Sequence, residues 1–379
     1  MRFPNYNSAW QKNKFGNLLT LLKNNTLSRA ELNYENGKIK DIHYGDVLIK
    51  FNDFVLSNSK IIPYINDDRI PHNYADLLLK TGDLVIADTA EDYTVGKATE
   101  LIFNDQSLII SGLHTIPCRP INNIFGSKYL GYYINSPSFH NQLLPLIQGI
   151  KVSSISKSQI VDTFISYPKI NEQCKITEFL TLIDQRIDTQ SKIIEKYKSL
   201  IKVINQMMCN FDHEKIQVQN VFDFKEKTKH QANMGNSQGN FIYFTNEEST
   251  YKYFDSYDFD GEYIIANTGG KANFKYYNGK FAVMSDCLVM ECNDNQNTKF
   301  YLYSILNRID YINQVCFVGS GLKHLDKKLF LKTFITKFNK NLEPFINLII
   351  LLEKKISNDK ILLQKLKEQK KYLLSNMFI

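Results

Sequence analysis

One passage of this sequence occurs twice, and each copy leads into a long helical pattern. QGIKVSSISKSQI at 148–160 returns as VGSGLKHLDKKLF at 318–330, with Gly149 matched by Gly319. A short apolar stretch follows each copy, TFISYPK in the first and TFITKFN in the second. Glycine-rich turns mark loops in any fold, but two copies in the same order indicate a duplication within the chain.

Apolar residues recur at alternating three- and four-residue steps after each copy, which is the heptad pattern of a coiled-coil helix. Ile349 lies 169 residues after Leu180, and Met377 lies 169 residues after Met208, so the two patterns match heptad by heptad. One mismatch is Lys370, which takes the place of an isoleucine. The predicted seam positions are Leu180, Ile183, Ile187, Gln190, Ile194 and Tyr197, and Ile349, Leu352, Ile356, Asp359, Leu363 and Leu366.

Both helices have plausible ends, because Asn171 and Asn341 stand where N-caps are expected and lysines crowd the far ends. A single amphipathic helix normally lies on the core of its own domain. Two matched seams in one chain are buried most economically against each other, so we predict that the helices pair.

The regions before the helices contain short strand-like runs at 82–88, 107–116, 261–267 and 279–290, punctuated by glycine and asparagine. GDLVIADTAED in the first region echoes GEYIIANTGGK in the second. The chain is therefore predicted to run globule, helix, globule, helix.

Composition sets limits on the function. With 379 residues and 43% hydrophobic content the chain can build two or three domains. A formal charge of +7 favours an acidic partner such as nucleic acid, but an ordinary basic protein has the same balance. The six cysteines include no C-x-x-C pair, so we expect neither a zinc ribbon nor a disulfide framework, and a reducing cytoplasm is the expected compartment. The longest apolar run, LIILL, is too short to cross a bilayer.

The order of GDLVIADTAED, SGLHTIPCRP, GYYINSP, QGIKVSSISKSQI and YPKINEQCKITEFLTLIDQRI resembles the specificity subunit of type I restriction-modification enzymes over nearly the whole chain. The resemblance implies an α+β fold in which two long antiparallel coiled-coil helices separate two globular target recognition domains, related by an internal pseudo-twofold repeat. The expected boundaries are 1–170 and 211–340 for the two recognition domains, and 171–210 and 341–379 for the two spacer helices.

The same resemblance implies a non-catalytic subunit that reads a bipartite, asymmetric target in double-stranded DNA. Its expected partners are two modification (methyltransferase) subunits and restriction (motor and nuclease) subunits, without any membrane. No cofactor is expected in this chain, whereas S-adenosylmethionine, ATP and Mg are expected on the partner subunits. No catalytic and no metal-binding residues are predicted.

Two other functions compete with this interpretation. A lone methyltransferase would need an Asn-Pro-Pro-aromatic motif, and the sequence contains no Pro-Pro; the segment TGGKA lacks the first glycine and the hydroxyl residue of a phosphate-binding loop. A structural scaffold that does not bind DNA, and uses its helices to join protein partners, also fits the repeat. Salt-dependent binding to duplex DNA would separate the scaffold from the DNA reader.

Basic and polar side chains on loops are the candidates for DNA contact, because phosphates supply affinity and base edges supply specificity. Lys97 has the alternative of a solvated hairpin lysine, His114 of a strand-end histidine with internal partners, and Arg119 of a brace to a carboxylate. The candidates are Lys97, His114, Arg119, Lys151 and Ser154 in the first globule, and Lys271, Asn273, Lys275, Ser320, Lys323 and His324 in the second.

The helices are long enough to set a distance between two DNA readers. A helix over 172–208 would measure ~55 Å, whereas one turn of B-DNA measures ~34 Å. In an antiparallel pair of equal lengths the midpoints meet, so we expect Gln190 and Asp359 to come near each other. The alternative is that both face solvent at a slack point of the seam.

Overall fold

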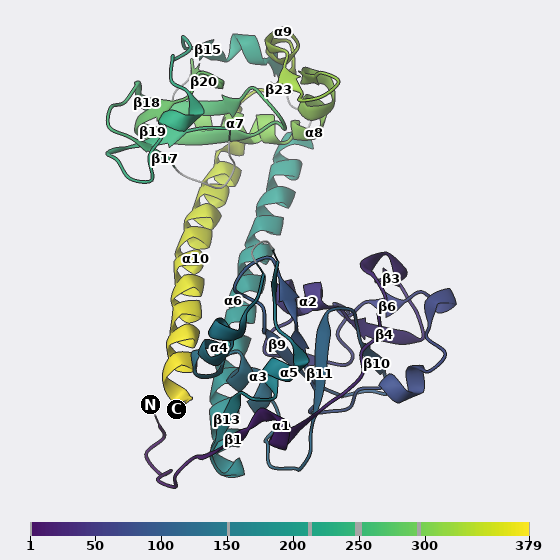
Figure 1. Ribbon diagram of the computed structural model, residues 1–379. Coiled ribbons are helices and arrows are strands. Elements are labelled where there is room, and N and C mark those ends of the chain that lie inside the picture. The colour runs from purple at the N-terminus through teal and green to yellow at the C-terminus, as the bar shows by residue number, and fades with distance from the viewer. Residues whose placement is uncertain (1, 150–151, 211–213, 247–251, 294–296, 379) are drawn as a thin grey trace. The chain divides into compact units, whose positions relative to one another are not determined.

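The computed structural model describes residues 2–149, 152–210, 214–246, 252–293 and 297–378. The chain forms two compact units: unit 1 comprises residues 1–191 and 362–379, and unit 2 comprises residues 192–361. The chain passes from unit 1 into unit 2 within α6 (Ile170–Asn210) and returns within α10 (Glu343–Met377), as Figure 1 shows.

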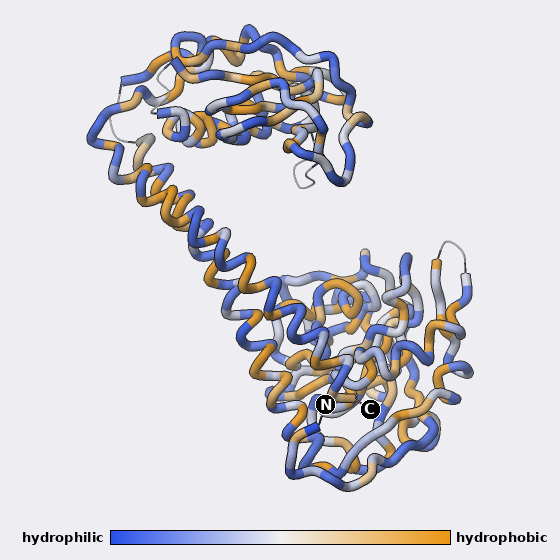
Figure 2. The backbone as a smooth tube through the Cα atoms, turned by 90° about the vertical axis from the view of Figure 1, so that its left-hand side faces the viewer, coloured by the Kyte–Doolittle hydropathy of each residue, from blue (hydrophilic) through white to orange (hydrophobic). Residues whose placement is uncertain are grey.

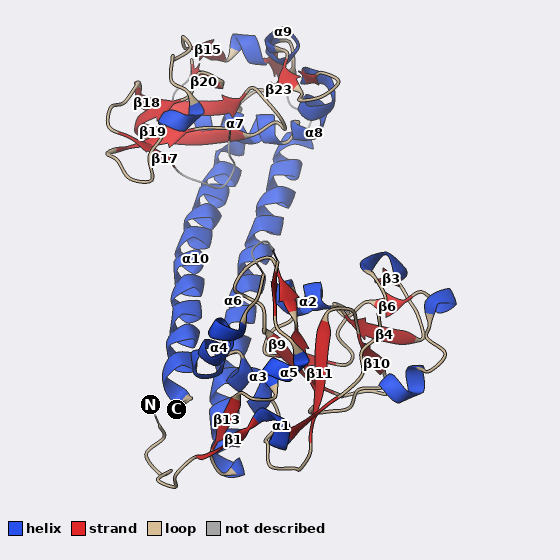
Figure 3. Cartoon of the chain, in the orientation of Figure 1, coloured by secondary structure: helices blue, strands red, loops and turns tan. Residues whose placement is uncertain are grey.

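The centre of unit 1 is a five-stranded sheet (Figure 3). Its neighbours pair antiparallel except at the β9–β5 edge, where the two strands are parallel. In spatial order the strands are β2 (Leu19–Leu21), β11 (Thr115–Pro120), β7 (Leu84–Ala87), β9 (Ala98–Ile102) and β5 (Phe54–Leu56).

Unit 1 also contains a smaller second sheet. Its strands are β10 (Leu108–Ser111), β4 (Ile39–Ile42), β6 (Tyr64–Ile65) and β3 (Leu32–Asn33). The helices of this unit are short: α1 (Phe15–Leu18), α2 (Tyr44–Ile49), α3 (Tyr129–Ile134), α4 (Pro137–Leu143) and α5 (Lys157–Ile160).

The centre of unit 2 is a six-stranded sheet. In spatial order its strands are β15 (Phe222–Phe224), β20 (Cys287–Cys292), β18 (Phe259–Asn267), β19 (Phe274–Val283), β16 (Phe241–Phe244) and β17 (Lys252–Phe254). The short helices are α7 (Thr298–Leu306), α8 (Ile309–Tyr311) and α9 (Lys327–Leu331).

The two sheets have the same topology once the edge strand β17 is set aside. In each, the five strands lie in the order first, fifth, third, fourth and second along the chain. In each, the contact between the fourth and second strands is the parallel one, β9 with β5 and β19 with β16. The duplication therefore extends through the globules, although their sequences diverge.

A second repeated feature joins the start of each unit to its joint passage. β1 (Gln11–Lys14) pairs antiparallel with β13 (Phe164–Tyr167), and β14 (Lys215–Gln217) pairs antiparallel with β23 (Phe334–Thr336). The TFIS and TFIT segments thus have the same role in both units, because each carries the chain from the joint to its long helix.

The long helices contribute to the core of each unit, and apolar and polar residues alternate along the helical stretch seen in Figure 2. In unit 1, Leu180 near the start of α6 and Leu373 near the end of α10 share one apolar cluster. In unit 2, Met208 near the end of α6 and Ile349 near the start of α10 share another. The helices are thus antiparallel within each unit, and the predicted α+β fold is confirmed. Of the helices in the described ranges, none combines the length and apolar character needed to span a membrane.

The predicted N-caps are wrong. α6 begins at Ile170, so Asn171 lies inside the helix, and the amide of Glu172 donates to the carbonyl of Lys169 at 2.9 Å. Asn341 lies in a 3-10 turn that precedes α10, and the side chain of Asn339 accepts its amide at 3.1 Å. In both cases the chain starts to coil before the residue that the sequence favoured.

The apolar run at 107–116 is two strands of different sheets. β10 ends at Ser111 and β11 begins at Thr115. His114 between them has a φ of 55°, a left-handed conformation that turns the chain from the smaller sheet into the central one.

Candidate nucleic-acid interface

In unit 1 the joint passage is hydrogen-bonded to the segment that follows the central strand β7. β12 (Ser153–Ser154) pairs antiparallel with β8 (Thr89–Ala90), with Ser154 opposite Thr89. The amide of Ile155 donates to the carbonyl of Asp88 at 2.9 Å. The joint therefore lies at the edge of the sheet where β7 ends.

Unit 2 repeats this arrangement. After the central strand β18, the carbonyl of Thr268 accepts the amide of Leu325 at 2.8 Å, and the amide of Gly270 donates to the carbonyl of Lys323 at 2.8 Å. Gly270 has a φ of 83°, so a glycine is required there. Each unit thus presents its joint at the corresponding edge of its own central sheet.

The joints also share a hairpin register. Gln148 bridges Ser154 in unit 1, and Val318 pairs with His324 between β21 (Phe317–Val318) and β22 (His324–Leu325) in unit 2. Each residue of the second pair lies 170 positions after its counterpart in the first. We refer to residues 148–149 with 152–154, and to residues 318–324, as the joint hairpins.

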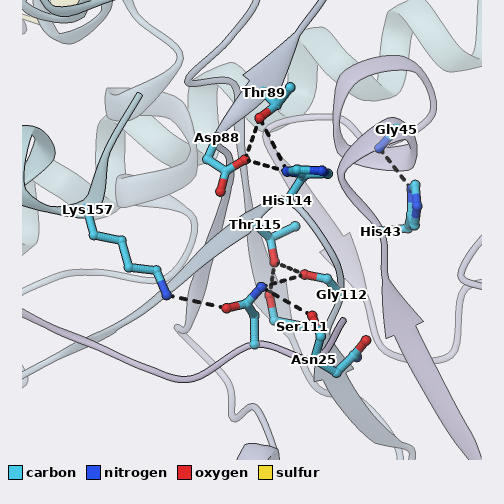
Figure 4. A network of polar contacts seen from close by, with 11 residues as sticks. Asn25, His43, Gly45, Asp88, Thr89, Ser111, Gly112, His114, Thr115 and Lys157 are labelled. Atoms are coloured by element: carbon cyan, nitrogen blue, oxygen red, sulfur yellow. Dashed lines mark hydrogen bonds and ion pairs between the residues drawn. The ribbon is translucent and has the colours of Figure 1, made fainter. Parts of the chain in front are cut away.

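His114 lies exposed beside the unit 1 joint (Figure 4). Its Nδ1 is 3.4 Å from Asp88 Oδ1 and 3.4 Å from Thr89 Oγ1. The imidazole ring packs edge-on against Tyr44 with the ring centroids 5.3 Å apart. Both predicted roles are therefore compatible with its position, because the ring has internal partners and is also accessible to a ligand.

Buried polar groups hold this edge in place. The side chain of Asn25 donates from Nδ2 to Asp41 Oδ2 at 2.5 Å, and the backbone N–H of Asn25 donates to the carbonyl of Ser111 at 2.8 Å. Burial raises the pKa of Asp41 to about 7, against the opposing hydrogen bond from Asn25. Burial, followed by the charge of Arg29, lowers the pKa of His43 to about 4, so its ring is neutral and accepts the amide of Gly45 at 3.2 Å.

Two predicted contacts are occupied inside unit 1. Arg119 donates from Nε and Nη2 to the two carboxylate oxygens of Asp83, at 2.8 and 2.6 Å, which is the bracing role that the sequence left open. Lys97 Nζ donates to the carbonyl of Leu48 at 2.9 Å, and burial lowers the pKa of this lysine. Lys151 lies outside the described residues.

In unit 2 the loops of the joint edge carry most of the predicted residues. Lys271, Ser320, Lys323 and His324 are exposed there. Asn273 instead closes the turn, because its amide donates to the side chain of Asn267 at 2.8 Å. Lys275 stands half-exposed, with Nζ 6.0 Å from the ring centroid of Phe244.

Several residues at these edges were not predicted. Lys157 Nζ donates to Asn24 Oδ1 at 3.3 Å, which brings the segment at 23–25 to the unit 1 joint. Asn313 Oδ1 accepts the amide of Ala272 at 2.7 Å and so supports the glycine turn of unit 2. The match between Lys157 and Lys327 in the repeat could have singled out the first; the sequence carries no signal for the second.

All twelve predicted seam residues lie at buried or half-buried positions. Eight are buried, and Ile187, Tyr197, Leu363 and Leu366 are half-buried. Gln190 is 9% exposed and Asp359 is 6% exposed, so the alternative that they face solvent does not hold.

Unit 1 has an apolar groove of about 690 Å³ on its part of the long helices. Leu182 of α6 and Leu362 of α10 line it, with 52% and 46% of their surface exposed. Arg186 and Gln190 add polar groups to the wall. The groove is therefore a second candidate surface, apolar where the joint edge of unit 2 carries exposed lysines.

The joint edges carry side chains that can bind a ligand, among them Lys271, Lys323 and His324. In the described parts of the chain, no group of three or more His, Cys, Asp or Glu side chains could hold a metal ion. Lysine, histidine, serine and glycine amides on short loops are the groups that contact phosphates and base edges in nucleic-acid complexes.

Comparison with known proteins agrees with this description. The profile of the family described as "Type I restriction modification DNA specificity domain" matches residues 7–198 and again residues 210–359. A search of curated protein sequences finds no significant match.

Solved structures share the fold along the full chain. The S subunit of a type I restriction-modification system from M. genitalium superposes with a TM-score of 0.60 at 15% identity, covering 100% of this chain and 97% of that one. A chain from a structure on complex assembly and conformational transition of the type I R-M system gives a TM-score of 0.57 at 10% identity, covering 98% and 97%.

Proposed function

This chain belongs to the type I restriction modification DNA specificity family, and from that premise we propose that each of its units reads one part of a split, asymmetric DNA target. The chain is a non-catalytic specificity subunit. Double-stranded DNA, two modification subunits and restriction subunits are its proposed partners. S-adenosylmethionine, ATP and Mg²⁺ belong to those partners in this proposal, and the cytoplasm is the compartment.

The shared strand order and the shared joint hairpin carry the proposal. Two globules with one framework and different loops suit two readers that approach DNA in related ways and recognise different bases. We assign DNA contact to His114 and Ser154 in unit 1, and to Lys271, Ser320, Lys323 and His324 in unit 2. Lys97 and Arg119 are not assigned, because their charged groups bind partners within unit 1.

The first test concerns the basic edge of unit 2. The double variant Lys271→Ala, Lys323→Ala should weaken DNA binding by the assembled modification complex. It should also make the negative slope of log K against log salt shallower by about one to two. Lys280→Ala is the matched control, because this exposed lysine lies far from the joint edge. It pairs with Asp260, which is seven residues along β18 from Asn267 at that edge, a distance of ~23 Å. If the complex shows no salt-dependent binding to duplex DNA, the protein scaffold is favoured.

The second test asks whether the two readers are separable. Residues 1–150 are exchanged for the matching part of a relative, and the methylated sequence is determined in DNA exposed to the subunit with its modification partner. One half of the sequence should change and the other should stay. A change in both halves would mean that the units read jointly.

The apolar groove of unit 1 is proposed as the docking surface of a modification subunit. Exposed leucines on paired helices are a feature of protein interfaces, which bury apolar cores within a polar rim. Assembly is also the subject of the related structure described above.

Leu182→Asp should remove modification subunits from the complex, because a carboxylate at the centre of an apolar interface is costly to bury. Leu144→Asp, an exposed leucine of unit 1 outside α6 and α10, is the matched control. Native mass spectrometry of the co-expressed complex counts the subunits. An unchanged count in Leu182→Asp would place docking elsewhere.

A further inference from the structure

The joint hairpin of unit 2 holds a leucine in solvent. Leu322 is 70% exposed and lies in the loop between the paired residues Val318 and His324. One exposed leucine needs no explanation by itself, since folded surfaces carry many apolar atoms. The position of Leu322 in the internal repeat is informative, because the equivalent residue of unit 1 can be compared with it.

The equivalent residue of unit 1 is also apolar and exposed. Val152 lies 170 positions before Leu322 and is 49% exposed. Both follow a glycine with positive φ, 104° at Gly149 and 138° at Gly319, by three residues. An apolar side chain thus occurs twice at a position where it is not packed in a core.

The hairpin that carries Leu322 is held firmly at its base. Leu325 pairs with Phe317 and donates its amide to the carbonyl of Thr268, while the carbonyl of Lys323 accepts the amide of Gly270. The backbone on either side of Leu322 is therefore ordered before any ligand arrives, so binding costs little backbone ordering entropy.

The charge around the hairpin favours an anionic ligand. Segments 268–275 and 317–328 together contain five lysines and one aspartate. The carboxylate of that aspartate, Asp326, accepts the amides of Lys328 and Leu329 at 2.8 and 3.1 Å as the N-cap of α9. Asp286, whose carbonyl accepts the amide of Thr268 at 3.0 Å, is a second aspartate at this edge and is exposed, but the lysines remain in excess. An apolar tip on such a basic surface fits a polyanion that also offers an apolar group.

B-DNA offers such a group in the major groove, which admits a two-stranded ribbon. The four bases present donors and acceptors there, and thymine adds its C5-methyl group. We propose that the hairpin 318–324 enters the major groove and that Leu322 reads a thymine through contact with this methyl. The inference rests on the proposed function and adds a specificity-determining residue to it.

The test removes the methyl from the DNA and the side chain from the protein separately. After the methylated sequence is known, each thymine of the half-site read by unit 2 is replaced singly by deoxyuridine, which lacks only the methyl. At one of these positions the substitution should weaken binding of the assembled complex by about three- to tenfold, as expected for one or two buried methyl-sized groups.

Leu322→Ala should weaken binding to the thymine-containing DNA by a similar factor. The affinity of this variant complex should not change further when deoxyuridine replaces thymine at that position. Deoxyuridine in the other half-site is the control, because the Leu322→Ala complex should respond to it as the parent does.

Two kinds of failure are distinguishable. If the complex binds DNA without any sequence preference, the proposed function fails. If a bipartite sequence exists but its unit 2 half contains no thymine, or if Leu322→Ala and deoxyuridine act additively at every position, only the thymine contact is overturned. A Leu322→Ala complex that assembles poorly but binds DNA normally once assembled would place the leucine against a partner subunit and overturn it as well.

Discussion

Lys370 carries its charge into the interior of unit 1. Its ammonium lies 2.6 Å from Asp53 Oδ2 and 2.6 Å from Asp184 Oδ1, and Tyr132 donates its hydroxyl to the other oxygen of Asp184 at 2.6 Å. Burial lowers the pKa of this lysine, but the charges of the two aspartates outweigh it and raise the pKa overall. The residue that breaks the heptad match thus has a structural role in unit 1.

Replacing this lysine should destabilise unit 1. Lys370→Met leaves two carboxylates without their cation, and loss of one partner from a buried ion pair costs about 3–5 kcal/mol. Trp10 is the sole tryptophan and packs against the unit 1 core, so its fluorescence in urea reports this unit. Lys371→Met, at an exposed neighbouring position, should leave the midpoint unchanged. Equal midpoints for the two variants would contradict the prediction.

Glu100 should make unit 1 less stable as pH rises towards neutrality. Its buried carboxylate accepts the amides of Lys128 at 2.6 Å and Gly131 at 3.0 Å, and burial raises its pKa from 4.5 to about 7 in spite of these bonds. The folded unit therefore holds the proton more tightly than the unfolded chain. The protonated Glu100 therefore contributes to the free energy of unfolding below about pH 4.5. This contribution, up to ~3 kcal/mol, is lost as the pH rises from about 4.5 to 7.

Glu100→Gln should flatten this part of the pH profile. Urea midpoints of the Trp10 signal, measured from pH 5 to pH 7.5, would fall less in the variant than in the parent. Glu91→Gln changes an exposed glutamate of the same unit and should keep the parental slope. Parallel profiles for parent and Glu100→Gln would show that the carboxylate ionises normally.

At the scale of elements, the last turns of α10 complete the core of unit 1. Leu373 and Met377 are buried, and Phe378 packs edge-on against Tyr129 and Tyr133 with ring centroids 5.7 and 5.6 Å apart. Leu373→Ala should destabilise unit 1 by about 2–5 kcal/mol through the lost burial and the cavity. Leu362→Ala, half-exposed on the same helix, should cost well under 1.5 kcal/mol in the same urea experiment. Similar losses would mean that the end of α10 is only loosely attached.

The sequence predicted those elements that depend on local pattern. Heptad spacing identified both long helices, since the positions of Leu180 and Ile349 follow from helical geometry alone. The sequence pattern did not show that the run at 107–116 is two strands, because the break between them depends on the left-handed turn at His114. It could not give the strand order either, because pairing of β5 with β9 joins residues about 46 positions apart through contacts that leave no periodic signal.

Prediction of the binding residues was limited for a similar reason. The exposed residues Lys271 and Lys323 could be recognised from glycine-rich loops. The guanidinium of Arg119 is bonded to Asp83, which lies 36 residues earlier in the chain, so local sequence could not reveal this contact. Likewise, no local feature distinguishes a lysine bonded to a backbone carbonyl, such as Lys97, from one that is free to bind a ligand.

At the scale of the whole molecule, the long helices are expected to set the gap between half-sites. Four residues inserted after Gln190 would add ~6 Å and rotate the following chain by ~40°, which corresponds to one or two base pairs of B-DNA. We expect methylation of the same half-sites with a gap longer by one or two pairs. The same four residues inserted after Gln238, in an exposed loop, should leave the gap unchanged. Full activity at the original gap would show that the helices do not measure distance.

Unit 1 is built from the first and the last parts of the chain, and this reverses the order in which the two units can be finished on the ribosome. Leu373, Met377 and Phe378 belong to the same cluster as Phe15 and Tyr129, so the nascent unit 1 has an incomplete core until residues 362–379 have emerged. Unit 2 is continuous over 192–361 and has all its residues earlier. Domains usually mature in the order of synthesis, but here the N-terminal globule waits for the final turns of α10 and is the last to close.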